Sequence, residues 1–144
     1  MSHTTRINGI TITDVTALRA AITELKAQGV KCDLLENAQP RGFFPNQSGM
    51  ETAPYVLKLE DSRYDVGLYP NTQGKGYECR TDFWGGDVER HLGTPNPTTD
   101  QARLGKLYQM YGVHAATRQA MMQGYTVQRS AKADGTIQLV LGNV

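Results

Sequence analysis

Five acidic side chains between positions 61 and 87 are the residues of this chain best suited to acid–base chemistry. They are Asp61, Asp65, Glu78, Asp82 and Asp87. Two carboxylates held together on neighbouring strands can act as a general acid and a general base. Their spacing does not require such a pair, and the exposed faces of antiparallel sheets routinely carry such charges. We therefore expect a solvated sheet face, with Asp65 capping a turn or pairing with Arg63, and we predict no catalytic residue.

Metal binding and nucleophilic catalysis are not indicated either. The three histidines, His3, His91 and His114, show no HxH or HExxH spacing. Cys32 and Cys79 have no CxxC partner, so we predict two reduced thiols, one on each of two strands. Gly74-Lys75-Gly76 and Gly85-Gly86 lack the GxxxxGKS/T pattern of a phosphate loop. We predict no metal and no cofactor.

Aromatic side chains in surface segments indicate a binding surface. Trp84 ends a predicted strand directly before Gly85-Gly86, and it is the residue that we most expect at a partner surface. Phe43 and Phe44 lie in the middle of a long polar loop, residues 37–53. Long loops in compact domains often carry function. Two adjacent phenylalanines there either fold back on the core or contact a partner.

Composition limits the class of protein. The 144 residues fit a single domain, 1–144, which is long enough to bury a core without a disulfide or a metal. The formal net charge of +1 leaves no basic footprint for nucleic acid. No apolar run approaches the roughly 20 residues that span a bilayer, and the N-terminus lacks an apolar signal region. We expect a soluble cytoplasmic protein that does not enter the membrane.

The elements that position these residues follow from the periodicity of the apolar side chains. Alternation predicts strands, and helical spacing predicts two helices that end at Gly29 and Gly124. The strands are predicted at 6–13, 30–35, 54–60, 64–69, 77–84, 125–130 and 136–141, and the helices at 15–28 and 104–123. Asp134-Gly135 predicts a type I′ turn. This order indicates an α+β fold: a mostly antiparallel twisted sheet, closed at its C-terminal end by that hairpin, with two helices packed on one face.

Two glycine positions carry further expectations. Asn8-Gly9 interrupts the first strand, so either a bulge lies there or the strand begins after it. Gly112 lies inside the second helix, where glycine costs about 1 kcal/mol relative to alanine. We expect it to mark the close approach of another backbone.

An ordered set of short motifs resembles a known family. The matching stretches include Arg41-Gly42-Phe43, Tyr64-Asp65-Val66-Gly67-Leu68, Gly76-Tyr77-Glu78, Asp82-Phe83-Trp84, Gln123-Gly124-Tyr125 and Asp134-Gly135-Thr136-Ile137-Gln138-Leu139-Val140-Leu141. Over almost the whole chain they are similar to the hypothetical chloroplast reading-frame thirty-five family, or domain of unknown function twelve fifty-seven. Arg41 and Tyr111, which fit the family pattern, join Trp84, Phe43 and Phe44 as predicted partner-binding residues. Met110 and Val113 depart from that pattern.

The same resemblance implies a source. The family occurs in plastids, cyanobacteria, other bacteria and bacteriophages. The loops at 44–53 and 93–100 look expanded, which suggests a divergent phage or bacterial member. A phage-encoded member would act in the host cytoplasm.

Three functions stay open at this point. The first is a small non-enzymatic binding or accessory protein that acts through a protein partner. The second is a nucleic-acid-associated factor, which would set exposed aromatics beside Arg41, Arg63, Lys75, Arg80, Arg118 and Arg129. The third is an enzyme or a small-ligand-sequestering protein, which would need a concave pocket. Self-association through an edge strand, such as Gly135 to Leu141, is compatible with each of them.

Overall fold

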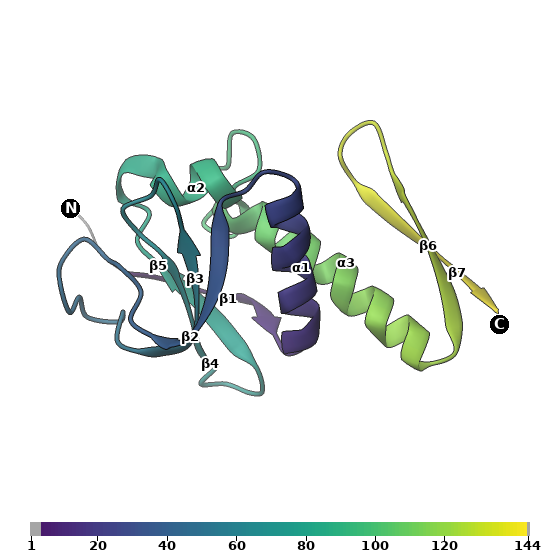
Figure 1. The fold of residues 1–144 in the computed structure, drawn as a ribbon, viewed down its shortest axis with the longest axis horizontal. Coiled ribbons are helices and arrows are strands. Elements are labelled where there is room, and N and C mark those ends of the chain that lie inside the picture. Colours follow the sequence, from purple (N-terminus) through teal and green to yellow (C-terminus); the bar gives the residue numbers. More distant parts are fainter. Residues whose placement is uncertain (1–3, 144) are drawn as a thin grey trace.

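The computed structural model describes residues 4–143, apart from the side chains of residues 8 and 9, so His3 lies outside the described residues. The fold is α+β, as the sequence predicts (Figure 1). The strands are β1 (Thr5–Ile12), β2 (Cys32–Ala38), β3 (Ala53–Leu59), β4 (Val66–Pro70), β5 (Tyr77–Thr81), β6 (Tyr125–Ala131) and β7 (Ile137–Asn143). The helices are α1 (Val15–Ala27), α2 (Asp87–Leu92) and α3 (Gly105–Met122), with 3₁₀ turns η1 (Trp84–Gly86) and η2 (Ala102–Leu104).

The main sheet has five antiparallel strands in the order β1-β5-β4-β3-β2. The strands from β2 to β5 therefore form a meander, which includes the three-strand meander predicted from the sequence. β1 returns to pair with β5, and their register shifts between Ile7 and Ile12. The predicted irregularity at Asn8-Gly9 thus interrupts the pairing within a continuous strand.

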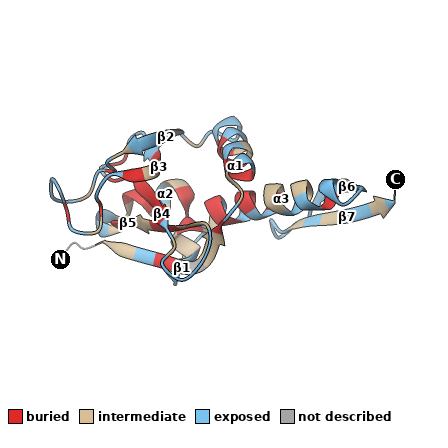
Figure 2. Cartoon of the chain, turned by 90° about the horizontal axis from the view of Figure 1, so that it is seen from below, coloured by how far each residue is buried: buried red, intermediate tan, exposed pale blue. Residues whose placement is uncertain are grey.

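The helices α1 and α3 cover one face of this sheet and pack against each other (Figures 1 and 2). Asp14 caps α1 by accepting a hydrogen bond from the Ala17 N–H at 3.0 Å. Gly29, with φ of +97°, ends the helical segment in a conformation that suits glycine. The main core, between the helices and the sheet, includes Leu18, Leu25, Leu57, Leu68 and Leu107.

The closing hairpin does not belong to the main sheet, so the prediction that it closes that sheet is wrong. β6 and β7 form a separate two-stranded sheet that lies beside α3 (Figure 1). Ile137 packs against the main core, whereas Leu141 is half exposed. An alternating strand pattern indicates only that one face of the strand is covered. In this hairpin the helix α3 covers that face, and within residues 4–143 no further layer of the main sheet is involved.

The turn of the hairpin also differs from the prediction. The Gly135 N–H donates to the Lys132 carbonyl at 3.0 Å, and the Lys132 N–H donates to the Thr136 carbonyl at 2.8 Å. Gly135 has φ of +88°, whereas Asp134 is not among the residues with positive φ. A type I′ turn needs positive φ at both central residues. The connection is therefore a three-residue loop with glycine in the left-handed position, and the Asp134 carboxylate accepts from the Thr136 N–H at 2.9 Å.

Two further expectations are corrected. The strand predicted to reach Trp84 ends at Thr81, and residues 87–92 form the short helix α2, which the sequence did not indicate. Gly112 is exposed, and a Cβ built there would meet no atom within 4 Å. No backbone approaches it, because it lies on the solvent side of α3. Within the described residues, none of the helices is both long and apolar enough to cross a membrane.

Candidate binding surface around Asp82

A buried carboxylate organises the end of the main sheet. Asp82 directly follows β5 and is only 1% exposed. Its Oδ1 accepts a hydrogen bond from the Trp84 N–H at 2.9 Å, and its Oδ2 accepts from Gln47 Nε2 at 3.4 Å. Gln47 in turn donates to Thr4 Oγ1 at 3.0 Å and accepts from the Phe44 N–H at 3.1 Å. One carboxylate therefore links the strand end that carries Trp84 to the loop that carries Phe44.

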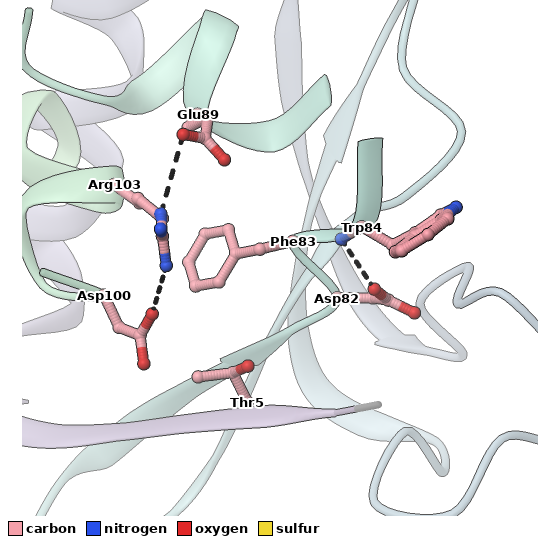
Figure 3. A pocket seen from close by; sticks show the side chains of 7 residues that line it. All are labelled: Thr5, Asp82, Phe83, Trp84, Glu89, Asp100 and Arg103. Atoms are coloured by element: carbon pink, nitrogen blue, oxygen red, sulfur yellow. Dashed lines mark hydrogen bonds and ion pairs between the residues drawn. The ribbon is translucent and has the colours of Figure 1, made fainter. Parts of the chain in front are cut away.

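Trp84 is held on the surface by a backbone that depends on glycine. Its side chain is 48% exposed, and it extends away from Phe83 (Figure 3). Gly85 and Gly86 follow with φ of +80° and +79°, which residues with a Cβ rarely adopt. A Cβ on Gly85 would also lie 2.1 Å from a guanidinium nitrogen of Arg63. The chain can turn sharply after Trp84 because both positions are glycine.

Phe43 and Phe44 do not fold back on the core. Their rings contact each other edge to face, with centroids 4.7 Å apart, and the residues are 45% and 57% exposed. Large apolar side chains this exposed are candidates for a binding surface. We refer to Phe43, Phe44 and Trp84 as the aromatic edge, since the Asp82–Gln47 contact fixes the two segments that carry them.

Arg41 anchors the start of the loop. Its Nε and Nη2 donate to the two carboxylate oxygens of Asp65 at 2.9 and 2.7 Å, and its backbone N–H donates to Asp65 Oδ2 at 2.9 Å. Asp65 also accepts from the buried Leu59 N–H at 3.1 Å. The sequence suggested Arg63 as the partner of Asp65. Arg63 instead pairs with Asp87 at 2.8 Å, in the first turn of α2.

A pocket of about 260 Å³ opens beside the aromatic edge. Arg103 lies over the ring of Phe83, 5.6 Å from its centroid, between Asp100 at 2.6 Å and Glu89 at 3.5 Å (Figure 3). Asp82 and Thr5 complete the lining with Trp84. Three carboxylates and one guanidinium give this pocket a formal charge of −2. Its charge favours positively charged groups and repels phosphate.

Tyr111 lies elsewhere and faces the interior. It is buried on α3, and its hydroxyl oxygen accepts from the N–H groups of Thr13 and Asp14 at 2.9 and 3.0 Å. These contacts fix the start of α1 against α3. The Gln47–Asp82 hydrogen bond therefore links the segment that carries Phe43 and Phe44 to the segment that carries Trp84. Arg41 supports the start of the same loop, and Tyr111 takes no part in these contacts.

The sequence that forms this fold and this surface matches a known protein family. Residues 21–140 match the family described as a protein of unknown function, DUF1257. The chain belongs to the DUF1257 family. The match spans the whole aromatic edge, Gln47 and Asp82, and most of the hairpin. No curated protein and no solved structure is significantly similar to the chain.

Four of the five acidic side chains considered in this DUF1257 chain do not form the solvated face that we expected from the sequence, whereas Asp61 is exposed as expected. Asp65, Glu78, Asp82 and Asp87 are all buried. The Arg6 side chain, which donates to Glu78 at 2.7 Å, lowers the pKa of that carboxyl. A hydrogen bond from Arg63 holds the pKa of Asp87 well below its usual range. Charge-assisted hydrogen bonds to the ionised form are the physical cause in both cases.

The remaining polar candidates have structural partners. Glu24 on α1 accepts from Arg129 of β6 and lies 2.7 Å from His114 Nε2 of α3. The Arg129 hydrogen bond is the largest cause that lowers the pKa of Glu24 to about 2. Cys32 and Cys79 are free, buried thiols on β2 and β5, as predicted, and burial raises the pKa of each to about 11. Among the described residues, no three side chains of His, Cys, Asp or Glu gather as a metal site would require.

Sequence reasoning missed Gln47 and the roles of Asp82 and Arg103. Gln47 is one of many polar residues in its loop, and 35 positions separate it from Asp82. The Asp82-Phe83-Trp84 motif drew attention to the correct segment. Neither its spacing nor its composition indicated that Asp82 is buried.

Proposed function

We propose that this DUF1257 protein is a small non-enzymatic binding or accessory protein that captures a partner protein on its aromatic edge. The observation that carries the proposal is the half-exposed state of Phe43, Phe44 and Trp84 on backbone segments fixed by partly buried hydrogen bonds. Aromatic side chains that are pre-positioned in this way lose little conformational freedom on binding. They are also the residue types that dominate the energetics of protein interfaces.

The charge of the adjoining pocket favours a particular type of partner. A Lys or Arg side chain beside an apolar segment would match the carboxylates of Glu89 and Asp100, with the apolar segment on Trp84. A nucleic-acid backbone would meet repulsion there. The arginines that a nucleic-acid surface would require are engaged with carboxylates of the same chain: Arg41 with Asp65, Arg63 with Asp87, Arg80 with Glu78, Arg118 with Asp14 and Arg129 with Glu24.

The ionisable groups support a binding role over catalysis. The pKa values of Glu24, Glu78 and Asp87 are all lowered, which keeps these carboxylates ionised and makes them poor proton donors near neutral pH. The raised pKa values of Cys32 and Cys79 keep both thiols protonated, and a protonated thiol is a weak nucleophile.

The test compares capture of partners by three tagged forms of the protein in its native cells. We expect Trp84→Ala and Phe44→Ser each to lose a protein that the parent chain retains. Tyr125→Ser, which alters an exposed aromatic on the hairpin, is the matched control and should retain that protein. Far-UV circular dichroism and cooperative thermal unfolding check that each variant folds. Equal recovery of the same protein by Trp84→Ala and the parent would exclude the aromatic edge as the binding site.

The only tryptophan provides a second readout with the purified partner. Because Trp84 is the single tryptophan of the chain, its emission reports directly on this surface. Burial of the indole by the partner should shift the emission to shorter wavelength and reduce quenching by acrylamide. Titration with single-stranded oligonucleotides tests the nucleic-acid alternative, since phosphate contacts weaken steeply as salt is raised. We expect no salt-dependent binding to them.

We further infer a setting for this activity from the sequence resemblance. We propose that the chain is related to the chloroplast reading-frame thirty-five proteins and comes from a phage or a bacterium. It would then act in the cytoplasm, or in the host cytoplasm if a phage encodes it. The expanded loops support a divergent member of the family. Fractionation of native cells with an antibody against the chain tests the location, and recovery in a membrane pellet would contradict it.

A further inference from the structure

The β6–β7 hairpin is attached to the domain by few contacts. Gln109 Nε2 on α3 donates to the Gly135 carbonyl at 3.0 Å, and Arg129 pairs with Glu24 on α1. Ile137 packs on the core. Within the described residues, no strand of the main sheet pairs with β6 or β7. An isolated two-stranded hairpin is marginally stable in water, so additional strands would stabilise it.

The strand β7 lacks the features that protect an edge strand from pairing. Its sequence, Ile137-Gln-Leu-Val-Leu-Gly-Asn143, contains no charged residue and no proline. Monomeric proteins commonly use such residues to prevent edge-to-edge association. Val140 and Leu141 are each 50% exposed. The edge strand is therefore uncharged and carries two half-exposed apolar side chains.

Backbone groups on this edge point outward at alternate residues. Lys132 and Thr136 share a hydrogen bond next to the turn, and β7 pairs Gln138 with Ser130 and Val140 with Gln128. Hydrogen-bonded and non-hydrogen-bonded pairs alternate along antiparallel strands. The even-numbered residues of β7 therefore bond to β6. Residues 137, 139 and 141 direct their N–H and C=O groups away from it.

We propose that β7 pairs antiparallel with β7 of a second copy of this chain, about a two-fold axis beside Leu139. This register places Leu139 opposite its own copy and Leu141 opposite Ile137 of the other chain. The outward groups then form three hydrogen-bonded pairs, which exchange about six hydrogen bonds. The two hairpins become one four-stranded sheet with both α3 helices on the same face.

Charge and burial favour a second copy as the occupant of this edge. No like charges meet across the axis, because β7 has none. In the dimer, the half-exposed Leu141 of one chain lies next to Ile137 of the other chain, and Ile137 is the residue of β7 that packs against the core. Lys132 and Asp134 lie at the turns, which the antiparallel arrangement places at opposite ends of the joined sheet.

Sedimentation equilibrium of the full chain measures the association. We expect a concentration-dependent rise from 15.9 kDa to twice that mass. The variant Val140→Lys/Leu141→Lys puts charges on the β7 edge and should raise the dissociation constant about tenfold or more. The control Thr126→Lys/Gln128→Lys puts the same charge on β6 and should leave the dissociation constant unchanged. A monomer at every concentration, or a dimer weakened only by the β6 variant, would overturn the proposal.

Cysteine pairing tests the register. An axis beside Leu139 sets Gln138 of one chain opposite Val140 of the other in a non-hydrogen-bonded pair, a spacing that suits a disulfide. A mixture of Gln138→Cys and Val140→Cys chains should therefore form a crosslinked heterodimer under mild oxidation, more rapidly than either variant alone. The native thiols, Cys32 and Cys79, are buried and do not interfere. Faster crosslinking of Val140→Cys with itself, or no crosslinking in the mixture, would contradict this arrangement.

Discussion

The most direct test of the supporting structure is the removal of the Asp65 carboxylate. Asp65 is 3% exposed and accepts four hydrogen bonds, three from Arg41 and one from the Leu59 N–H. The substitutions Asp65→Ala and Asp65→Asn remove, respectively, all of its acceptors and its charge. Both leave the helices and the aromatic edge unchanged in sequence.

The expected cost follows from the partners that each substitution leaves behind. In Asp65→Ala the buried Leu59 N–H loses its acceptor, which costs about 1–3 kcal/mol. The charge-assisted bonds from Arg41 contribute toward the lower end of about 1.5–3 kcal/mol each. Water can partly replace them, because the Arg41 side chain is 44% exposed. We expect the free energy of unfolding to fall by about 4 kcal/mol, within the range for breaking a buried ion pair.

The variant Asp65→Asn separates charge from shape. The amide keeps one acceptor oxygen but presents an NH₂ group to the donors of Arg41, so we expect a loss of about 2 kcal/mol. Asp61→Asn is the matched control, because it removes the same charge from the same connection between β3 and β4. Asp61 is 73% exposed and pairs with Lys31 on the surface, which predicts a change below about 0.5 kcal/mol.

Urea unfolding followed by far-UV circular dichroism measures these differences as shifts of the midpoint at an unchanged m-value. The order expected for the loss is Asp65→Ala, then Asp65→Asn, then Asp61→Asn. If Asp65→Asn and Asp61→Asn lower the midpoint equally, the buried carboxylate does not stabilise the loop as we infer.

Three further outcomes follow from the structure. Arg129 is the main cause that lowers the pKa of Glu24 from 4.5 to about 2, so the contribution of this carboxylate to stability is complete above about pH 4.5 and is lost as the pH falls toward 2. The urea midpoint of Glu24→Gln should therefore fall less than that of the parent across this pH window. Parallel curves for the two proteins would contradict the pairing. Gly112→Ala should raise the free energy of unfolding by about 1 kcal/mol, because the added methyl group meets no neighbour, and a lower midpoint in urea would indicate a close contact. Cys32 and Cys79, whose pKa values burial raises to about 11, should react with a thiol reagent at pH 8 only after unfolding, whereas rapid reaction of the folded protein would show an accessible thiolate.

Local structure could be predicted from the sequence because its determinants are local. The helical spacing of Val15, Leu18, Ile22 and Leu25 predicted α1, and the helical segment ends at Gly29 as expected. Alternating apolar residues located each of the seven strands seen in residues 4–143 to within a few positions. The short helix α2 was not predicted, because its six residues cover less than two helical turns, which is too few to establish a periodic pattern.

The tertiary partners could not be predicted in the same way. Ile137, Leu139 and Leu141 alternate identically whether the hairpin packs on a sheet or on a helix. The buried carboxylates pair with arginines that are distant in sequence. Glu78, for example, pairs with Arg6, which is 72 positions away. From the sequence alone, an acidic residue on a strand is predicted to be solvent-exposed, because its distant arginine partner is not known. The exposure of Trp84 fits the surface position predicted for it, whereas its partner-binding role stays a prediction.

The separation of the hairpin from the main sheet affects how this molecule can open locally. Because no ladder hydrogen bond joins β6 and β7 to the other strands, the hairpin can open without dismantling the core, and its amides should exchange with solvent at a lower free energy than those of β3 and β4. Substitutions on its outer face therefore carry little penalty for the folding of the domain.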